Sequence, residues 1–504
     1  MYCCTDTSIQ NYIMIKSKKV NEIQIDGADP HLESRSTAFN IYLNLLERFD
    51  SRELFLLESL GPASIDTRTS LIGINQVLNI EVFDCIVTIS GNEELLREIQ
   101  SLYEGELLIE SRLGMLRYQL ISRNAIWNFL RLLDSRFRMV EGGVLASAVF
   151  SYNTIYFIED IAGYTQGDIP DICLTCYSTF IEFGNEQVML HEYEFAGSKH
   201  ITFSEISPYL LLRDLTLGAL VKTKFSVAKE TLKNNYLKKA ATALQHVKLG
   251  DVYQIQIGQK VTVKSDISAL DVYARLRLLN PSPYMYLFDY GNNKVIGASP
   301  ELFVYMKDRD VMMRPIAGTL GKSLIPNKET AAAEFYANPK EIAEHMMLVD
   351  LCRNDLCKVS LPKSLSVSEL MSVEEYSHVY HMISTAKSLA REDCDKYDVI
   401  QAAFPAGTMT GTPKIRAIEL ISNIEDSSRG LYAGALGVIG LGHNYINTAL
   451  CIRTAIECNQ IFSLRASAGI VSDSVIEGEY IETLHKMGSV FKAITNEEIS
   501  CHVV

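Results

Sequence analysis

Hydrophobic residues between positions 37 and 200 gather in short runs separated by polar and turn-forming residues, a pattern typical of strands. Helical spacing predicts two helices among them, at Glu93–Tyr103 and Ser122–Leu133. Residues 1–35 are polar and are expected to form a loose arm. The expected strands are Leu54–Leu57, Val82–Ile89, Leu107–Glu110, Val144–Phe150, Ile172–Phe180 and Gln187–His191.

The second half alternates strands and helices as far as about residue 494. A helix is predicted at Phe225–Leu249 and ends at Gly250, a residue suited to the position after a helix. A strand at Val252–Ile257 follows, and Val261–Val263 continues it. The pattern indicates an α+β protein whose segments, 1–215 and 216–496, are intertwined, with the weakest boundary near 201–221.

The loop Phe404–Arg416 runs into a helix whose buried face is marked by four regularly spaced residues, Ile415, Ile418, Ile421 and Ile424. Thr412 suits the N-cap and Pro413 the first helical position. The helix dipole, with Lys414 and Arg416, favours a carboxylate or phosphate ligand there. The alternative is a capped helix without a ligand. The spacing is not that of a Walker A loop.

Composition narrows the class of protein. The 504 residues are 47% hydrophobic and 21% charged, with a net charge of −14 and no basic run, so nucleic acid is not the expected partner. No apolar run reaches the roughly 20 residues that span a bilayer, and the N-terminus does not resemble a signal peptide. Eleven scattered cysteines suit a reducing compartment, so a cytoplasmic location is expected. The isolated Cys173–Cys176 pair is interpreted as buried structural thiols.

Paired carboxylates recur at helical spacing in two distant segments. Glu341 and Glu344 are three residues apart, and so are Glu479 and Glu482, so each pair projects from one helix face. Two such helices could share one Mg²⁺, which prefers one or two carboxylates with water and ligand oxygens. The alternative is a set of solvated helix faces.

Other polar residues stand in apolar surroundings. Arg453 lies in a strand that looks buried, so its charge requires a carboxylate from the protein or from a ligand. His381 also lies in an apolar segment and alone is more often a core residue than an acid or base. The cluster Asp350–Asp355 follows an apolar run and is either a structural network or a helix end near a ligand. The small-residue turn Ala466–Val471 could bring backbone N–H groups close to a ligand.

Together these segments resemble the chorismate-utilising enzymes, and among them the large component of anthranilate synthases. The resemblance is strong over residues 222–494 and weak before them, where it rests chiefly on Leu56-Leu-Glu-Ser59. It rests on the loop Phe404–Arg416 and on Gly250-Asp-Val-Tyr-Gln254, Asn280-Pro-Ser-Pro-Tyr-Met285, Gly297-Ala-Ser-Pro-Glu301, Arg314-Pro-Ile-Ala-Gly-Thr319, Glu344–Asp355, Tyr376–His381, Cys451-Ile-Arg453 and Ala468–Ser474.

The resemblance implies large antiparallel β-sheets in a sandwich flanked by helices. It implies that Glu344 and Glu482 bind Mg²⁺, with Glu341 and Glu479 nearby. His381 and Glu301 match residues that handle protons, and Gln254 and Thr408 match further catalytic positions. Implied substrate-binding residues are Ala317, Gly318, Thr319, Tyr432, Arg453, Ser467, Ala468, Gly469 and Lys486.

The implied reaction adds ammonia to the chorismate ring as hydroxide departs, and then eliminates pyruvate to give anthranilate, the first step of tryptophan biosynthesis. Two positions favour this branch. Ala317 stands where para-aminobenzoate-type synthases commonly carry a nucleophilic lysine. Gln254 stands where isochorismate and salicylate synthases have a lysine that activates water. The resemblance further implies a separate glutamine amidotransferase that supplies ammonia, typically in a heterotetramer.

Feedback inhibition by tryptophan is a further implied trait, and its expected site has two walls. A serine hydroxyl and a glutamate suit the ammonium group of the inhibitor, while the pocket floor admits an indole. The alternative is a plain strand edge packed on a proline-rich turn. The residues expected at the site are Glu58, Ser59, Pro281, Ser282, Tyr284 and Met285.

Several positions depart from the family pattern. Leu320-Gly-Lys-Ser323 replaces an arginine-bearing run, Ser467 replaces a common glycine, Ile476 a usual proline and His485 a usual asparagine. The metal positions are intact, but the product is left open. The alternatives are synthesis of 2-amino-2-deoxyisochorismate or of aminodeoxychorismate. A third is a catalytically degenerate scaffold that only binds tryptophan.

Overall fold

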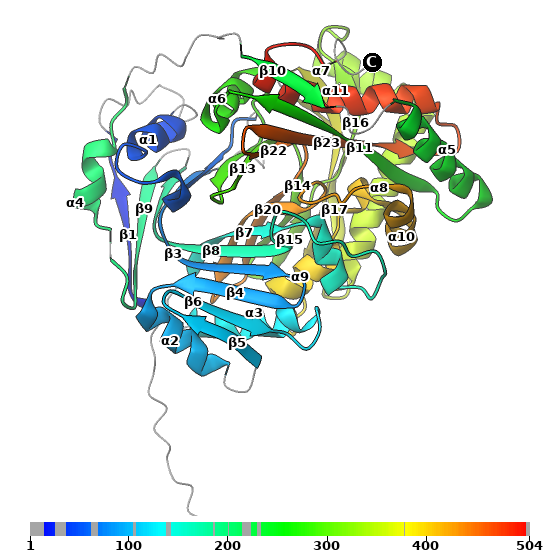
Figure 1. Ribbon diagram of the computed structural model, residues 1–504. Coiled ribbons are helices and arrows are strands. Elements are labelled where there is room, and N and C mark those ends of the chain that lie inside the picture. The colour runs from blue at the N-terminus through cyan, green and yellow to red at the C-terminus, as the bar shows by residue number, and fades with distance from the viewer. Residues whose placement is uncertain are drawn as a thin grey trace, which may run out of the picture.

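The computed structural model describes residues 15–25, 37–61, 69–103, 107–137, 143–184, 187–199, 201–213, 223–228, 233–376 and 378–499. Strands and helices alternate irregularly along the chain, and every strand pairing among these residues is antiparallel. Figure 1 shows two layers of sheet with helices on their outer sides. The predicted α+β class with large antiparallel sheets is therefore confirmed.

The first layer is built mainly from the second half of the chain. Its strands are β2 (Leu54–Glu58), β10 (Phe225–Ala228), β11 (Gln254–Ser265), β12 (Tyr284–Asp289), β13 (Asn293–Ser299), β19 (Gly411–Thr412), β22 (Thr454–Cys458) and β23 (Ile461–Ile470). β11 pairs with β10, β19 and β23, and the sheet continues through β22, β13 and β12 to β2.

The second layer centres on β8, which is buried along nearly its whole length because strands flank it on both sides. Its strands are β1 (Ile15–Ile23), β3 (Ser70–Phe83), β4 (Ile86–Gly91), β5 (Leu107–Arg112), β6 (Met115–Gln119), β7 (Val144–Phe150), β8 (Ile172–Phe183), β9 (Val188–Phe195), β14 (Leu302–Lys307), β15 (Asp310–Met313), β16 (Ile316–Gly321), β17 (Ser366–Glu375), β18 (Val379–Leu389), β20 (Ala435–Leu441) and β21 (Tyr445–Leu450).

Helices cover both layers. They are α1 (Thr37–Leu45), α2 (Glu93–Leu102), α3 (Ala125–Phe137), α4 (Phe203–Ile206), α5 (Lys233–Leu249), α6 (Ala269–Leu279), α7 (Lys328–Ala337), α8 (Pro339–Cys357), α9 (Lys396–Ala403), α10 (Lys414–Ile424) and α11 (Ile476–Thr495). α5, α6 and α11 pack over the first layer, whereas α7 and α8 pack on β16, β17 and β18 (Figure 1). None of the described helices is both long enough and apolar enough to cross a membrane.

Two large apolar clusters hold the layers together. One fills the space between β11, β12, β23 and the helices α1, α5, α6 and α11. The other packs β3, β7, β8 and β20 against α2, α3 and α9. Strands from distant parts of the sequence meet inside both, because β2 pairs with β12 and β7 pairs with β20.

Several predicted elements need correction. Residues 15–23 form β1, which pairs with β9, so this part of the expected arm is ordered into the sheet, while 1–14 and 26–35 lie outside the described residues. Residues Phe225–Ala228 form β10 instead of a helical turn, and α5 begins at Lys233. The run Val82–Ile89 contains a turn between β3 and β4. Gly250 follows α5 with a positive φ of 82°, as expected for its position.

The helix after the glycine-rich loop starts one residue later than predicted. Pro413 is the N-cap of α10, and Thr412 belongs to β19, where its backbone pairs with Gln254. Lys414 Nζ lies 2.6 Å from Asp355 Oδ2, and Arg416 lies 3.0 Å from Glu419. Carboxylates of the protein thus already pair both cations, and the expected anion seat stays a prediction that rests on the helix dipole. The same contact makes the Asp350–Asp355 cluster structural at its buried end.

A buried ion pair fastens α3 to α9. Lys396 Nζ lies 2.7 Å from Asp134 Oδ1, and the two side chains are 1% and 6% exposed. Asp134 also accepts from the Gly442 amide. Replacing Lys396 by Met would leave a buried carboxylate without its cation, so the free energy of unfolding should fall by about 3–5 kcal/mol.

Chemical denaturation measures this loss. The control is the double variant Lys396→Met with Asp134→Asn, whose neutral amide keeps an acceptor for Gly442 and should recover much of the stability. Equal instability of the single and double variants would show that the charge imbalance is not the cause.

Candidate active site

Pairing of β11 with β23 places polar side chains on one face of the first layer. Ser467 on β23 donates to Gln256 Oε1 at 2.8 Å, and its hydroxyl lies 2.6 Å from the Tyr432 hydroxyl. Gln254 lies two residues before Gln256 and therefore on the same face of β11. Both amide nitrogens lie against Gly469, since a Cβ at that position would fall 2.4 and 3.0 Å from them. Gly469 is thus required by this close approach.

A buried ionic network holds this face in place. Glu425 accepts from Arg429, Arg465 and the Gly258 amide at 2.6–3.0 Å. Although burial alone would raise it, the two guanidinium groups hold the pKa of Glu425 down to about 2. Arg429 also donates to the carbonyls of Met409 and Gln256. The network therefore ties the loop before α10 to β11.

Arg453 is the cation for which the sequence required a partner. Among the described residues its guanidinium makes no ion pair or hydrogen bond, although Glu482 and the Tyr432 hydroxyl lie near enough to favour its charge. Burial outweighs them and lowers the pKa of Arg453. Its backbone has a positive φ of 52°, and its carbonyl accepts from Ala298. By accessible surface the residue is half-buried, and a carboxylate supplied from outside the chain would satisfy its charge.

The two glutamate pairs meet between α8 and α11. Burial raises the pKa of Glu341, Glu344 and Glu479, and repulsion from other carboxylates of the group, including Glu482, adds to the effect. Lysines offset the charge only in part: Lys340 lies 3.7 Å from Glu344 and Lys486 lies 2.6 Å from Glu482. This concentration of carboxylates suits a divalent cation.

Within the described ranges, however, no three His, Cys, Asp or Glu side chains converge closely enough to form a complete metal site by themselves. The donor set instead resembles the partial protein coordination that Mg²⁺ accepts when water and ligand oxygens complete it. Glu479 also accepts from Ser474 at 2.7 Å.

The predicted turn 317–319 lies beside these glutamates. Gly318 has a φ of 69° at an irregularity in the pairing of β16 with β18, and a Cβ there would meet Phe335 at 2.6 Å and Glu341 Oε2 at 3.0 Å. The irregularity turns the Gly318 carbonyl toward His381, whose Nδ1 lies 2.8 Å away. Because a carbonyl only accepts, Nδ1 carries the proton and Nε2 is left as an acceptor. Burial lowers the pKa of His381 to about 4, so the ring is neutral at pH 7.

Glu301 follows β13 and is 7% exposed. Burial raises the pKa of its carboxyl group to about 8, against smaller opposing effects of the Thr408 hydroxyl, the Ile316 amide and Lys486. Thr408 makes no well-formed hydrogen bond among the described side chains, so its hydroxyl is a weak partner for Glu301. A buried glutamic acid of this kind can donate a proton near neutral pH.

Lys486 completes the group. It lies four residues after Glu482 on α11 and donates to the Ser467 carbonyl at 3.0 Å. It thereby links the glutamates to the face of β11 and β23. The structure thus brings the predicted catalytic, substrate-binding and metal residues into one region, around the ends of β11, β13, β16 and β23 and between α8 and α11. Sequence analysis did not single out Gln256 or Glu425, although the alternation Gln254-Ile-Gln256 already indicates two amides on one face.

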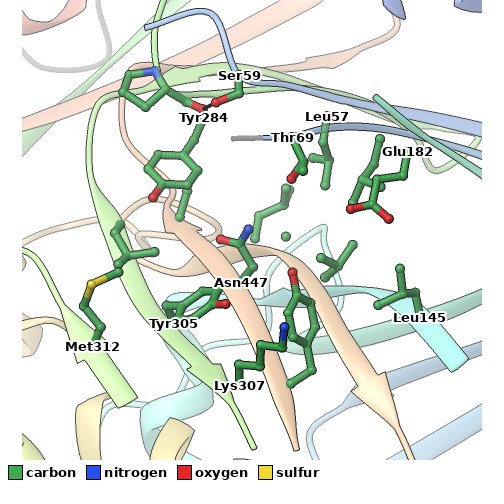
Figure 2. Close-up of a pocket in the computed structure, with 18 of the residues that line it drawn as sticks. Leu57, Ser59, Thr69, Leu145, Glu182, Tyr284, Tyr305, Lys307, Met312 and Asn447 are labelled. Carbon is green, nitrogen blue, oxygen red and sulfur yellow. Dashed lines mark hydrogen bonds between the residues drawn. The ribbon is translucent and has the colours of Figure 1, made fainter. Parts of the chain in front are cut away.

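A separate pocket of about 710 Å³ lies between the two layers. Figure 2 shows Ser59 and Tyr284 at one end and Lys307 at the other. Of the expected tryptophan-site residues, Glu58, Ser59, Tyr284 and Met285 line it, whereas Pro281 and Ser282 do not. Ser59 donates to the Pro283 carbonyl at 3.0 Å.

The Glu58 carboxylate is not placed as expected for an ammonium ligand. It accepts from Tyr273 at 2.7 Å and from Arg277 at 2.7 and 3.0 Å, and its side chain is fully buried. These partners lie on α6, and the neighbouring Leu57 and Ser59 face the pocket because side chains alternate along a strand. The carboxylate is therefore already neutralised by Arg277 inside the protein.

The cysteine pair is structural. Cys173 and Cys176 lie on β8, are buried and form no disulfide among the described cysteines. Burial raises the pKa of both thiols. This confirms the interpretation as buried structural thiols.

Comparison with known proteins agrees with the geometry. The chain belongs to the chorismate binding enzyme family, whose sequence profile matches residues 114–492. It is 38% identical to the 2-amino-4-deoxychorismate synthase of Streptomyces globisporus, over 92% of this chain and 95% of that protein. It is 31% identical to anthranilate synthase component 1 of Bacillus subtilis, over 91% of each.

A solved structure shows the same fold. The crystal structure of anthranilate synthase component I from Streptococcus pneumoniae superposes with a TM-score of 0.65 at 27% identity, covering 93% of this chain and 99% of that one. The predicted resemblance to chorismate-utilising enzymes and to anthranilate synthase large components is thus confirmed.

The raised pKa of Glu301 gives a prediction about stability. Folding disfavours the ionised carboxylate, so the contribution of the protonated group is complete below pH 4.5 and is lost as the pH rises through about 8. Glutamine cannot ionise. The Glu301→Gln variant should therefore gain thermal stability relative to the unaltered chain at pH 9 but not at pH 5. Melting temperatures at the two pH values measure the effect, and an identical difference at both would contradict it.

Proposed function

We propose that this chain aminates chorismate, using ammonia and Mg²⁺. The observation that carries the proposal is the grouping of two glutamate pairs, from α8 and α11, beside a half-buried arginine that has no ion pair or hydrogen bond among the described residues. Chorismate carries two carboxylates. A Mg²⁺ held by the glutamates would complement one of them, and Arg453 would complement the other. Family membership supports chorismate as the substrate.

Glu344 and Glu482 would hold the Mg²⁺, with Glu341 and Glu479 beside them. A metal held there would supply Lewis acidity toward the ring carboxylate. At the other end, Arg453 binds the enolpyruvyl carboxylate, with Tyr432 and the backbone of the turn Ser467-Ala468-Gly469 close by. Ala317, Gly318 and Thr319 form the wall next to Glu341.

Proton transfer falls to Glu301 and His381. At pH 7 a carboxyl group with a pKa of about 8 is mostly protonated, so Glu301 can protonate the departing hydroxide, with Thr408 next to it. His381 is neutral and presents Nε2 as an acceptor, which suits removal of the ring proton in a later elimination. Gln254 is a neutral amide and cannot deprotonate water, and Ala317 offers no nucleophile, so ammonia is the attacking group.

Ammonia adds at ring carbon 2 and the hydroxyl at carbon 4 leaves, which keeps the enolpyruvyl group. Release of this amino compound is the product we favour. It corresponds to the name of the Streptomyces globisporus relative, which matches over nearly its full length at higher identity than the Bacillus subtilis anthranilate synthase component. The departure at Ser467 is consistent with a modified second step.

A second candidate is complete anthranilate synthesis, in which pyruvate is eliminated after amination. Retention of Glu301, His381 and Lys486 around one region favours it, because these groups can transfer the protons that elimination needs. In either case we propose that ammonia comes from a separate glutamine amidotransferase subunit. A heterotetramer with two such subunits is the proposed assembly.

Tryptophan is the proposed inhibitor at the pocket that Ser59, Tyr284 and Met285 line. The Ser59 hydroxyl and nearby carbonyls would contact the ammonium group, because Arg277 already neutralises Glu58. The aromatic wall that Tyr284 and Tyr305 supply is suited to an indole. Inhibition would require coupling of this pocket to the active site through two states of the whole protein.

The metal role is tested by Glu482→Gln. Loss of one ligand should lower ammonia-dependent turnover of chorismate by about 100-fold or more and raise the Mg²⁺ concentration needed for half-maximal rate. Turnover is followed with chorismate, Mg²⁺ and an ammonium salt, and products are identified by fluorescence and mass spectrometry. A non-aromatic amine would support the favoured product and anthranilate the second candidate. Unchanged turnover in the variant would remove the metal role of Glu482.

The regulatory proposal is tested by Ser59→Ala. Loss of the hydroxyl should weaken tryptophan inhibition by about tenfold, the cost of one hydrogen bond to a charged group, while turnover without tryptophan stays near that of the unaltered chain. Inhibition curves at fixed chorismate measure the shift. An unaltered curve would count against tryptophan binding at this pocket.

A further inference from the structure

Gln256 lies in the active-site region, but no role follows for it from the reaction described above. It is 8% exposed, lies on β11 between the substrate-side residue Gln254 and Gly258, and is opposite Gly469 of β23. The backbone N–H of Gln256 donates to the Thr410 carbonyl, and the Gln256 carbonyl accepts from Arg429. The side-chain NH₂ group remains to bind a ligand.

The hydrogen bonds of Ser467 determine how that amide is oriented. A serine hydroxyl has one proton, and Gln256 Oε1 can only accept, so Ser467 must donate to Gln256. The contact between Ser467 and Tyr432 must then be donated by the tyrosine. The chain of hydrogen bonds therefore runs from Tyr432 through Ser467 to Gln256.

This direction has two consequences. The Gln256 NH₂ group points away from Ser467 and lies over Gly469, and among the described residues it donates no hydrogen bond. The Tyr432 proton is committed to Ser467, so the phenol presents only lone pairs to anything else. An anionic ligand oxygen here would find donors on Gln256 and Arg453 but none on Tyr432.

We infer that Gln256 is a further substrate-binding residue, whose amide N–H groups donate to the enolpyruvyl carboxylate that Arg453 holds. Ser467 is a positioning residue that keeps the amide in this orientation. The inference rests on the proposed function, since it takes chorismate as the ligand. In this arrangement the Tyr432 oxygen is an acceptor, which suits the nearby Arg453 guanidinium.

The surroundings favour a carboxylate over a neutral partner. Arg453 is half-buried near Tyr432 and has no ion-pair partner among the described residues, and Lys486 Nζ binds the Ser467 carbonyl. The Gln256 NH₂ group has no acceptor among the described residues. Ser467, which donates to Gln256, also contacts Tyr432 and Lys486, so a ligand carboxylate in this region can supply the acceptor. Gly469 keeps the position open, because a side chain there would displace both glutamine amides.

Two substitutions at one position test the inference. Gln256→Glu keeps an acceptor for Ser467 but replaces the NH₂ group by an anionic oxygen that repels a carboxylate. Gln256→Met removes both functions without adding charge. If Gln256 binds substrate, chorismate affinity should fall at least 30-fold in the glutamate variant and about tenfold in the methionine variant. If Gln256 only supports Ser467, the order reverses, because the glutamate variant keeps that support.

Affinity is measured by isothermal titration of chorismate in the presence of Mg²⁺ and without ammonium, and KM and kcat are measured separately with ammonium. The KM for chorismate should rise in both variants with a smaller change in kcat. Thermal melting confirms that both variants fold. Ser467→Ala should weaken binding by a smaller factor, since the amide stays present but loses its orientation.

The outcomes separate this inference from the function on which it rests. If the unaltered chain binds and aminates chorismate and Gln256→Glu binds it equally well, the role of Gln256 is overturned and the proposed function stands. A methionine variant weaker than the glutamate variant also overturns it. If the unaltered chain neither binds nor aminates chorismate, the proposed function fails first and the inference fails with it.

Discussion

The Glu425 carboxylate, buried between Arg429 and Arg465, is the interaction on which the active-site region depends. It joins three segments that are far apart in sequence: β11 through the Gly258 amide, β23 through Arg465, and the loop before α10 through Arg429 and Met409. One carboxylate among two guanidinium groups leaves net positive charge in the interior, and the rings of Tyr152 and Tyr432 lie near Arg429 to share it. Loss of Glu425 would leave the buried guanidinium groups of Arg429 and Arg465 without this counter-charge.

A second constraint comes from charge of the opposite sign. The glutamates of α8 and α11 are held close although they repel one another, and among the described residues Lys340 and Lys486 offset their charge. Such an arrangement is unfavourable in the folded protein unless a cation joins it. A protein keeps this kind of electrostatic strain where function requires it, and here the strain lies beside the irregular turn at Gly318. Arg453 is the complementary case, because this cation has no anionic partner among the described residues.

Local patterns predicted much of the fold and of the site. The expected strands such as Val144–Phe150 and the helix at Glu93–Tyr103 were found because they have clear periodicity and turn signals. Motif positions such as Arg453 and Glu482 were identified by resemblance. Errors arose where pairing with a distant strand overrides a local signal. Residues 225–228 were expected to be helical but pair with β11 as β10, and Thr412 was expected to be a helix N-cap but pairs with β11 as part of β19. Nothing local to Glu58 indicates that Arg277, more than two hundred residues later, neutralises it.

The pairing of β7 with β20 has a consequence for synthesis on the ribosome. Val144 lies opposite Leu441, so the second layer cannot close until about 300 further residues have been made. At roughly 5–20 residues per second this takes on the order of 15–60 s, during which an apolar strand edge stays without its neighbour. The nascent chain is thus exposed to edge-to-edge association for most of translation, and its yield in cells should depend on chaperones that cover such edges.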